Sequence, residues 1–249
     1  MKNYQDENIK AIESWIDKGW KWGRPFDHKQ CEDIRHGDWP FLLTPLKRMP
    51  KEWIGQIEGK KILGLASGGG QQMVILAILG GECVLLDYSQ KQIDSDLFVA
   101  RREGYEIQTI KGDFTKPLPF EDGQFDTIVN PVSLVYAEKI EPIFQETYRV
   151  LKHGGIFVAG FDNGMNFVTD DEKQITNSFP VNPLLNPEQE KKFLAANDGY
   201  EFSHTVSEII HGLLFAGFRI ADCFEDFNEE GPLAKLKIPT FLAIRAIKD

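Results

Sequence analysis

Short apolar runs alternate with amphipathic stretches through the middle of the chain. Mostly apolar runs predict four buried strands, at 61–66, 82–86, 125–129 and 156–160. A fifth segment, 105–110, alternates apolar and polar side chains, as a strand with one exposed face does. This spacing of short strands leaves room between them for one helix each.

The stretches between these strands carry apolar residues at helical spacing. Helices are expected from Gln71 to Leu79, after the capping residue Ser89, and along the face that holds Ile140, Phe144 and Tyr148. Glycines follow each of them, as is typical of helix ends. Strands and helices that alternate through such short connections predict an α/β protein with a doubly wound, mostly parallel sheet.

The C-terminal part departs from this alternation. An amphipathic helix is expected from Val206 to Leu214, ending before Gly217, and it precedes two strand-like runs at 218–224 and 240–247. About fifteen residues without a helical period separate these runs, so they should pair antiparallel at one edge of the sheet. The full prediction is a seven-stranded, Rossmann-like sheet with an antiparallel C-terminal edge strand.

Two segments stand outside the strand and helix pattern. Residues 1–55 hold all five tryptophans, and residues 161–202 are rich in Asn, Pro and Asp. Long connections within a compact domain are usually lids or binding elements, so both segments are expected to cover the same crevice. We therefore expect one domain, 1–249, with four parts: an N-terminal helical cap (1–55), a βα core (56–160), a lid insertion (161–205), and a C-terminal helix with a β-hairpin (206–249).

Composition and charge narrow the class of protein. The chain has 249 residues, of which 42% are hydrophobic and 27% charged, as in ordinary globular proteins, and its net charge is −10. No apolar stretch approaches the roughly 18–20 residues of a membrane helix, and the first ten residues lack the apolar run of a secretory signal. Three scattered cysteines, Cys31, Cys83 and Cys223, support neither a disulfide framework nor a metal site. With no basic run, we expect a cytoplasmic protein without nucleic-acid or membrane partners.

Three strand ends carry residues that suit a nucleoside. Ser67-Gly68-Gly69-Gly70 follows the first strand, where glycines let a ligand approach the backbone and the next helix offers free N–H donors. Asp87 ends the second strand, placed for two ribose hydroxyls. Asp113 and Phe114 follow the third strand and could bind an exocyclic amine and stack beside a base. Ligands in open α/β sheets bind beyond these strand ends, so the three features predict one nucleoside-shaped site.

These segments resemble the class I S-adenosylmethionine-dependent methyltransferases, particularly the small-molecule type related to the ubiquinone and menaquinone-biosynthesis methyltransferases. The resemblance covers roughly residues 60–160 and, more loosely, the C-terminal hairpin. It is carried by Ile62-Leu-Gly-Leu-Ala-Ser-Gly-Gly-Gly70, Leu86-Asp87-Tyr-Ser89, Gly112-Asp113-Phe114, Phe125-Asp-Thr-Ile-Val129 and Arg149-Val-Leu-Lys-His-Gly-Gly-Ile-Phe157. It implies that S-adenosyl-L-methionine is the cofactor.

The resemblance also implies a set of cofactor-binding residues. Ala66, Ser67, Gly68 and Gly70 would hold the methionine part, Asp87 the ribose, and Tyr88, Asp113 and Phe114 the adenine, while Asn130 and Pro131, with Val132 and Ser133, would line the exit of the methyl group. Two positions depart from the family pattern. Gly64 stands where an acidic residue is usual, and Ala66 stands where a glycine is usual. Arg24 and Arg35 are candidates for the cofactor carboxylate, and the alternative for both is a solvated surface position.

Catalysis in such an enzyme needs few groups. The sulfonium activates the methyl, so an in-line displacement requires alignment and, where the acceptor bears a proton, a base. No base can be assigned from the sequence. His36, in the cap, is the candidate to test first, since His153, His204 and His211 fit helix ends or half-buried helix positions. Trp15 and Trp53 are expected to anchor the cap, whereas Trp20, Trp22 and Trp39 could equally face a ligand.

Two other functions remain open at this point. A binding module that senses the nucleoside without turnover would explain the altered Gly64 and Ala66. An NAD-dependent oxidoreductase would explain a degenerate G-x-A-x-x-G at 64–69 followed by Asp87. The favoured prediction is methyl transfer to a small-molecule acceptor, and the sequence identifies neither the acceptor atom nor the oligomeric state.

Overall fold

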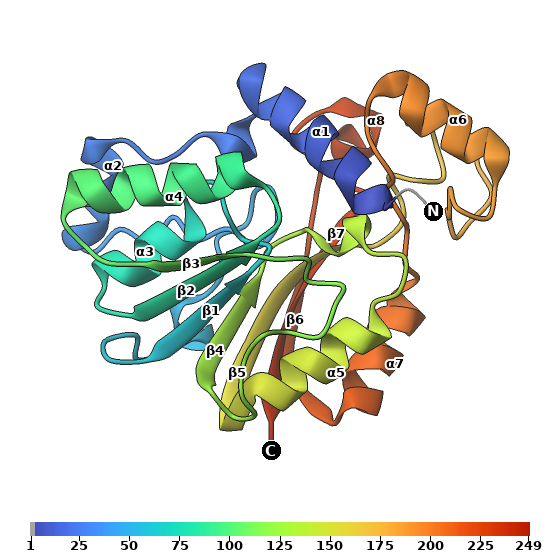
Figure 1. Ribbon diagram of the computed structural model, residues 1–249. Helices are drawn as coiled ribbons and strands as arrows, with labels where there is room; N and C mark the ends of the chain where they lie inside the picture. The colour runs from blue at the N-terminus through green and yellow to red at the C-terminus, as the bar shows by residue number, and fades with distance from the viewer. Residues whose placement is uncertain (1–2) are drawn as a thin grey trace.

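The computed structural model describes residues 3–249, in which seven strands form one mixed sheet (Figure 1). The strand order is β3-β2-β1-β4-β5-β7-β6. The strands are β1 (Lys61–Leu65), β2 (Glu82–Asp87), β3 (Gln108–Lys111), β4 (Phe125–Asn130), β5 (Leu151–Asp162), β6 (Phe218–Asp226) and β7 (Phe241–Lys248). The first five are parallel, and β7 pairs antiparallel with both β5 and β6.

The predicted fold class is confirmed. The antiparallel strand is the C-terminal one, although β7 lies between β5 and β6, and β6 forms the edge. The order of the parallel strands reverses between β1 and β4, which makes their carboxyl ends the switch point at which α/β sheets bind ligands.

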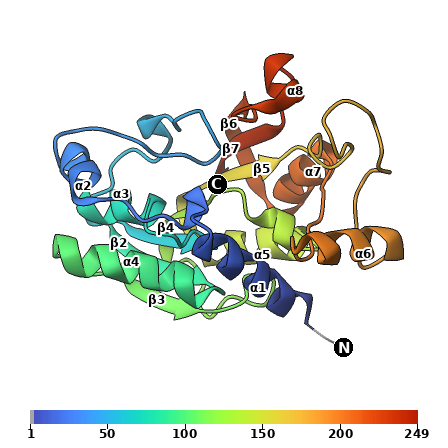
Figure 2. The same cartoon turned by 90° about the horizontal axis from the view of Figure 1, so that it is seen from above.

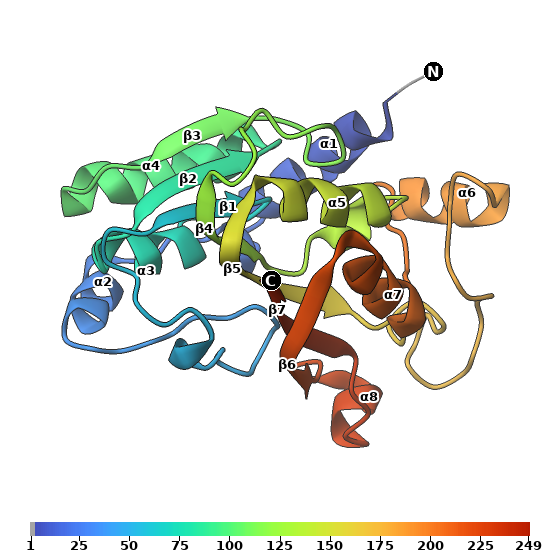
Figure 3. The same cartoon turned by 90° about the horizontal axis from the view of Figure 1, so that it is seen from below.

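Helices cover both faces of the sheet (Figures 1 and 3). On one face lie α2 (His28–Arg35), α3 (Gln72–Ile78) and α4 (Gln90–Glu103), and on the other α5 (Glu141–Val150) and α7 (Val206–Ala216). Neighbouring residues of β1 point to opposite faces: Ile62 packs in the core under α3, whereas Leu63 packs with α5 and α7. Both are fully buried. The near-continuous apolar strands are thus explained by a sheet covered on both sides.

Local signals set the ends of the long helices. Ser89 caps α4 by accepting from the Gln92 amide at 3.3 Å, and the helix ends at Gly104, which adopts φ 77°. Thr205 and Glu208 form a capping box at the start of α7, which ends at Gly217 with φ 104°. These ends coincide with those that the sequence predicts.

The structure contains helices that the sequence did not indicate. Helix α6 (Pro187–Ala196) lies in the lid segment and α8 (Gly231–Lys235) in the β6–β7 connection. Helix α6 starts from the side chain of Asn186, which accepts from two backbone amides, but its Leu194 is exposed and its apolar stripe is weak. Helix α8 is too short to show a period. Strand β5 also begins five residues early, because a register irregularity opposite β4 lets it continue through Gly154.

The start of the N-terminal segment lies over the carboxyl ends of the strands, and its later part, which includes α2, runs beside one face of the sheet (Figures 1 and 2). It contains α1 (Tyr4–Asp17), η1 (Lys21–Gly23), α2 and η2 (Lys51–Trp53), and α1 lies at the same end of the molecule as α6. The Tyr200 amide donates to the Asn8 side chain at 2.5 Å, and the Gln5 side chain donates to the Tyr136 carbonyl at 2.8 Å. The N-terminal segment and the lid segment therefore meet above the switch point. Among residues 3–249, no helix combines the length and the apolar character needed to cross a bilayer.

Candidate active site

A cavity of about 520 Å³ lies at the switch point, enclosed by the strand ends, the N-terminal segment and the lid segment. Its core side is formed by residues that follow β1, β2, β3 and β4. Its cover is formed by α1, by Trp20 and Trp22, and by the stretch Leu42–Pro45. Its far part is lined by residues between Asp162 and Glu201. We call the part next to β1 and β2 the cofactor half, and the part next to the lid segment the acceptor half.

Six of the ten predicted cofactor-binding residues line this cavity: Ala66, Gly68, Asp87, Tyr88, Phe114 and Pro131. The other four lie behind the lining. They are Ser67, Gly70, Asp113 and Asn130.

The loop after β1 keeps a left-handed turn in spite of its alanine. Ala66 adopts φ 47°, a conformation that costs a residue with a Cβ roughly 1–2 kcal/mol. Its amide donates to the Leu86 carbonyl at 2.8 Å, which ties the turn to β2. The alanine therefore keeps the chain path that a glycine would take and adds strain.

Other parts of the protein pack closely against two glycines of this loop. A Cβ on Gly69 would collide with the Trp22 carbonyl, and a Cβ on Gly70 would lie 2.6 Å from Pro25. The amide of Gly68 donates to Asp87 at 3.0 Å, and those of Gly69 and Gly70 donate to one carboxylate oxygen of Asp96 at 2.9 Å each. The amides of the turn are thus engaged within the protein, and the expectation of free N–H donors at the start of the next helix stays a prediction.

Asp87 is the best-placed polar group of the cofactor half. One carboxylate oxygen accepts from the Ser89 amide at 2.9 Å and the other from the Gly68 amide at 3.0 Å. A carboxylate oxygen has two lone pairs, so each keeps one for a hydroxyl group in the cavity. Burial raises the pKa of Asp87 to about 6, although its backbone hydrogen bonds oppose this rise. A bidentate contact to a diol fits this geometry.

The side chains of Asp113 and Asn130 form hydrogen bonds within and between the loops that surround the cavity. Asp113 accepts from the amide and the hydroxyl of Thr115, and its side chain does not reach the cavity lining, in contrast to the expected contact with an exocyclic amine. Asn130 is fully buried and donates to the Leu65 carbonyl at 2.6 Å and to Ser133 at 2.7 Å. It joins the ends of β1 and β4, and Pro131, Val132 and Ser133 supply the wall there.

The histidine and arginine candidates lie elsewhere. His36 is exposed, its Nδ1 lies 2.8 Å from the Glu32 carbonyl, and it is outside the cavity lining, so it has no position from which to act on an acceptor. None of the five histidines lines the cavity within residues 3–249. Arg35 binds Glu32 and Glu103, and Arg24 donates to the Gly19 carbonyl, so neither reaches a cofactor carboxylate here. Both fit the surface alternative.

The tryptophans divide between packing and the cavity. Trp53 is buried and donates to Asp222 at 2.9 Å, which anchors the N-terminal segment to β6. Trp15 packs on Trp20 with ring centroids 5.5 Å apart. Trp39 stacks on Phe41 and donates to the Met49 carbonyl at 2.6 Å, which makes it a packing residue as well. Trp20 and Trp22 line the cavity.

The acceptor half is acidic, a property that the sequence interpretation missed. Asp162, Asp170, Asp198 and Glu201 line it, and Lys192 is its cation among residues 3–249, already paired with Asp170. Burial, with the nearby charges of Asp198 and Asp162, raises the pKa of Glu201 to about 8. Asp162 is the last residue of β5 as Asp87 is the last residue of β2, so its place at a strand end was the signal available in the sequence.

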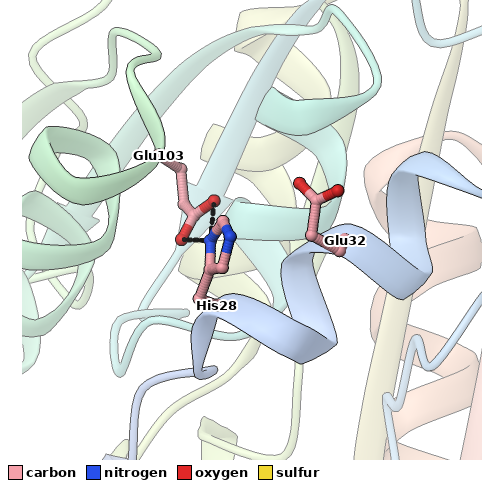
Figure 4. Close-up of side chains that lie close together, drawn as sticks. All are labelled: His28, Glu32 and Glu103. Carbon is pink, nitrogen blue, oxygen red and sulfur yellow. Dashed lines mark hydrogen bonds and ion pairs between the residues drawn. The ribbon is translucent and has the colours of Figure 1, made fainter.

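A second cluster of titratable side chains lies away from the cavity (Figure 4). The carboxylate of Glu103 accepts from His28 at 3.1 Å, from Arg35 at 2.9 Å and from Arg102 at 2.6 Å. Burial opposes its ionisation, but hydrogen bonds from these three side chains outweigh it and lower the pKa of Glu103 to about 2. With its oxygens engaged by cations, Glu103 joins α2 to the end of α4 and is a poor metal ligand, although Glu32 lies nearby.

Comparisons with known proteins agree with this geometry. The family model described as "Methyltransferase domain" matches residues 63–159. An uncharacterized methyltransferase of Bacillus subtilis, YbaJ, is 36% identical over 97% of this chain and 97% of its own length. The chain belongs to the class I S-adenosylmethionine-dependent methyltransferases. S-adenosylmethionine is therefore its cofactor, and the dinucleotide alternative is not carried further.

More distant relatives share either a part of this sequence or the fold alone. The sterol 24-C-methyltransferase erg6 of Aspergillus fumigatus is 34% identical over 107 residues, which is 42% of this chain and 28% of that protein. A structure of a putative S-adenosylmethionine-dependent methyltransferase from Listeria monocytogenes has a TM-score of 0.61 at 18% identity, covering 80% of this chain and 94% of that one. The geranyl diphosphate C-methyltransferase of Streptomyces coelicolor A3(2) has a TM-score of 0.59 at 15% identity, covering 89% and 79%. These two structures share the fold. The closer likeness to the ubiquinone and menaquinone-biosynthesis enzymes stays a prediction.

Proposed function

We propose that this methyltransferase acts on a small molecule bound in the acceptor half of the cavity. The observation that carries the proposal is the cavity itself, which runs without a break from Ala66 and Asp87 to Asp162 and Glu201. Its volume of about 520 Å³ lies in the range of small-molecule sites. The net charge of −10 favours such an acceptor over a nucleic acid. The cytoplasm remains the expected compartment.

The residues of the cofactor half fit S-adenosylmethionine, which supplies a methyl group activated on its sulfonium. Asp87 would accept from both ribose hydroxyls with its two remaining lone pairs, and Phe114 would pack on the adenine. The turn at Ala66 and Gly68 would hold the methionine part. Pro131 and Ser133 would wall the path from the methyl group to the acceptor half. All of these roles follow from positions in the cavity lining.

The acidic lining supports an acceptor with a basic nitrogen. Aromatic walls from Phe167 and Phe193, together with the acidic side chains of Asp198 and Glu201, are what a positively charged ammonium group prefers, and its charge in turn favours the ionised form of Glu201. In the step itself, the ammonium group would first give a proton to the ionised form of Glu201, which frees the nitrogen lone pair. That lone pair would attack the methyl carbon in line, and the carbon–sulfur bond would break with its electron pair passing to the sulfur, which becomes a neutral thioether. The Glu201 pKa of about 8 suits proton exchange near neutral pH.

A screen with labelled cofactor tests this function. The protein, with S-adenosylmethionine carrying a labelled methyl, is incubated with small amines and with the alcohol and carboxylic acid of matching carbon skeleton. We expect labelled product from amines. Labelling of only neutral or anionic acceptors would overturn the basic-nitrogen assignment, and cofactor binding without any labelling would favour the non-catalytic binding module.

The Glu201→Gln variant tests the base. We expect it to lower kcat about 10²–10⁴-fold, the usual worth of general base catalysis, and to leave cofactor affinity unchanged. Glu188→Gln is the matched control, because Glu188 is exposed on α6 in the same segment. If both variants keep wild-type kcat, Glu201 is not the base.

A further inference from the structure

A buried carboxylate outside the cavity lining holds the loop that carries the cofactor half. Asp96 lies in the middle of α4 and is fully buried. Its Oδ2 accepts from the amides of Gly69 and Gly70, 27 and 26 residues away, at 2.9 Å each. Gly69 and Gly70 adopt φ 122° and 74°, so these two contacts fix a turn that the chain enters only with left-handed backbone conformations.

β1 offers no carboxylate to this loop. Gly64 has no side chain, and the sulfur of Met73 occupies the space that a Cβ there would take. Of the amides of Gly68, Gly69 and Gly70, Asp87 accepts only from that of Gly68. The negative charge that faces Gly69 and Gly70 therefore comes from α4.

Among the described residues, no cation is hydrogen-bonded or ion-paired with Asp96. Its Oδ1 has no hydrogen-bond partner there, and the titratable groups that interact electrostatically with it are Asp87 and Cys83 on β2 and Tyr105 after α4. Helix α3, which packs on α4, carries no titratable side chain. Burial raises the pKa of Asp96 to about 7, and the charge of Asp87 adds to this rise against the two amide hydrogen bonds. The group is thus poised between its neutral and its ionised form near neutral pH.

We propose that Asp96 is a positioning residue for the cofactor, whose ionised carboxylate holds Gly69 and Gly70 so that the turn at Ala66–Gly68 receives the methionine part. Charged acceptors bind N–H groups about twice as strongly as neutral ones, so the ionised form holds the loop more tightly. A cationic cofactor beside the loop favours the same form. Binding is then coupled to release of a proton from Asp96. This proposal rests on the assignment of Ala66–Gly70 to the methionine part.

Calorimetry with three ligands separates this role from a general effect on folding. The ligands are S-adenosylmethionine, S-adenosylhomocysteine and methylthioadenosine, which lacks the amino-acid part. We expect Asp96→Asn, which keeps one neutral acceptor, to weaken the first two roughly tenfold or more and to change methylthioadenosine less than about twofold. Asp94→Asn, an exposed change on the same helix, should match the wild type. Equal weakening of all three ligands, or wild-type affinity for all three, would overturn the proposal.

The number of protons released on binding is a second measurement, and a purely structural role of Asp96 would not change it. Titrations at pH 6.5 in buffers of different ionisation enthalpy count the protons released when S-adenosylmethionine binds. We expect the wild type to release more than Asp96→Asn. Should that variant not fold, the triple variant Asp87→Asn, Asp162→Asn, Glu201→Gln serves instead, because it removes the carboxyls of strongly raised pKa that line the cavity. The release that remains in it is assigned to Asp96, and none remaining would refute the proposal. If the wild type bound methylthioadenosine alone, the assignment of the loop itself would be wrong, an outcome distinct from a failure of Asp96.

Discussion

The substitution Asp87→Asn tests the cofactor half most directly. Each carboxylate oxygen of Asp87 uses one lone pair on a backbone amide, which leaves two acceptors for the two ribose hydroxyls. Asparagine keeps one acceptor oxygen and no charge. The variant therefore loses at least one hydrogen bond to a charged group, worth about 1.5–3 kcal/mol, which corresponds to roughly 10–150-fold in Kd.

This loss of affinity can be measured by isothermal titration calorimetry with S-adenosylhomocysteine and its 2′-deoxy and 3′-deoxy analogues, each of which lacks one of the two ribose hydroxyls. In the wild type, removal of either hydroxyl should weaken binding. In Asp87→Asn, at least one of the two removals should have little further effect, because its partner is already lost. If both analogues lose as much affinity in the variant as in the wild type, Asp87 does not bind the ribose. Thermal unfolding of the variant without ligand checks that the loop still folds.

The pH dependence of the same site has a definite sign. Burial raises the pKa of Asp87 to about 6, so its ionised form, the acceptor of two hydroxyls, is lost as pH falls below 6. Affinity for S-adenosylhomocysteine should therefore decrease between pH 7 and pH 5. The contribution of Asp87 to the stability of the unliganded protein should have the opposite pH dependence and increase as pH falls. A carboxyl whose folded pKa is raised stabilises the fold most below its unfolded pKa of about 4, and that contribution is lost as pH rises through 6.

Two further substitutions probe the loop and the packing of the N-terminal segment. Ala66→Gly removes a Cβ from a residue at φ 47°. We expect the free energy of unfolding, measured with denaturant, to rise by up to about 1 kcal/mol, because the backbone strain is relieved. A decrease of more than about 1 kcal/mol would contradict the strain argument. Glu103→Gln breaks the ion pairs with Arg35 and Arg102 and should cost about 1–3 kcal/mol. Because the pKa of Glu103 is lowered to about 2, this contribution is present above pH 4.5 and is lost as pH falls towards 2, so the wild type and the variant should converge in acid.

Local sequence signals predicted most of the fold. The capping residues Ser89 and Thr205 and the glycines 104 and 217 act on their own helix ends, so they can be recognised without knowing the rest of the molecule. Segments that depend on distant partners were missed. Helix α6 exposes Leu194 and has little apolar periodicity, and its place is given by contacts such as Tyr200 with Glu190 and Asn8.

The candidate site was predictable where a residue ends a strand. Ala66, Asp87 and Phe114 follow β1, β2 and β3, and parallel strands bring their carboxyl ends together, so pattern alone places them at one edge. The structure does not bring Asp113 into the cavity lining, because its side chain accepts from Thr115. His36 also lies outside the lining, because the path of the N-terminal segment has no local signature in the sequence.

What the sequence by itself determined is therefore the alternation of strands and helices, the sheet that follows from it, and the strand ends that line the cavity. These depend on periodicity and turn chemistry within a few residues. Only the tertiary structure decided which groups face the cofactor and the acceptor. Asp96 reaches Gly69 across 27 residues, and Glu201 reaches the cavity lining from the far end of the long segment after β5. Such contacts depend on how separate segments pack in space, and no short stretch of sequence specifies that packing.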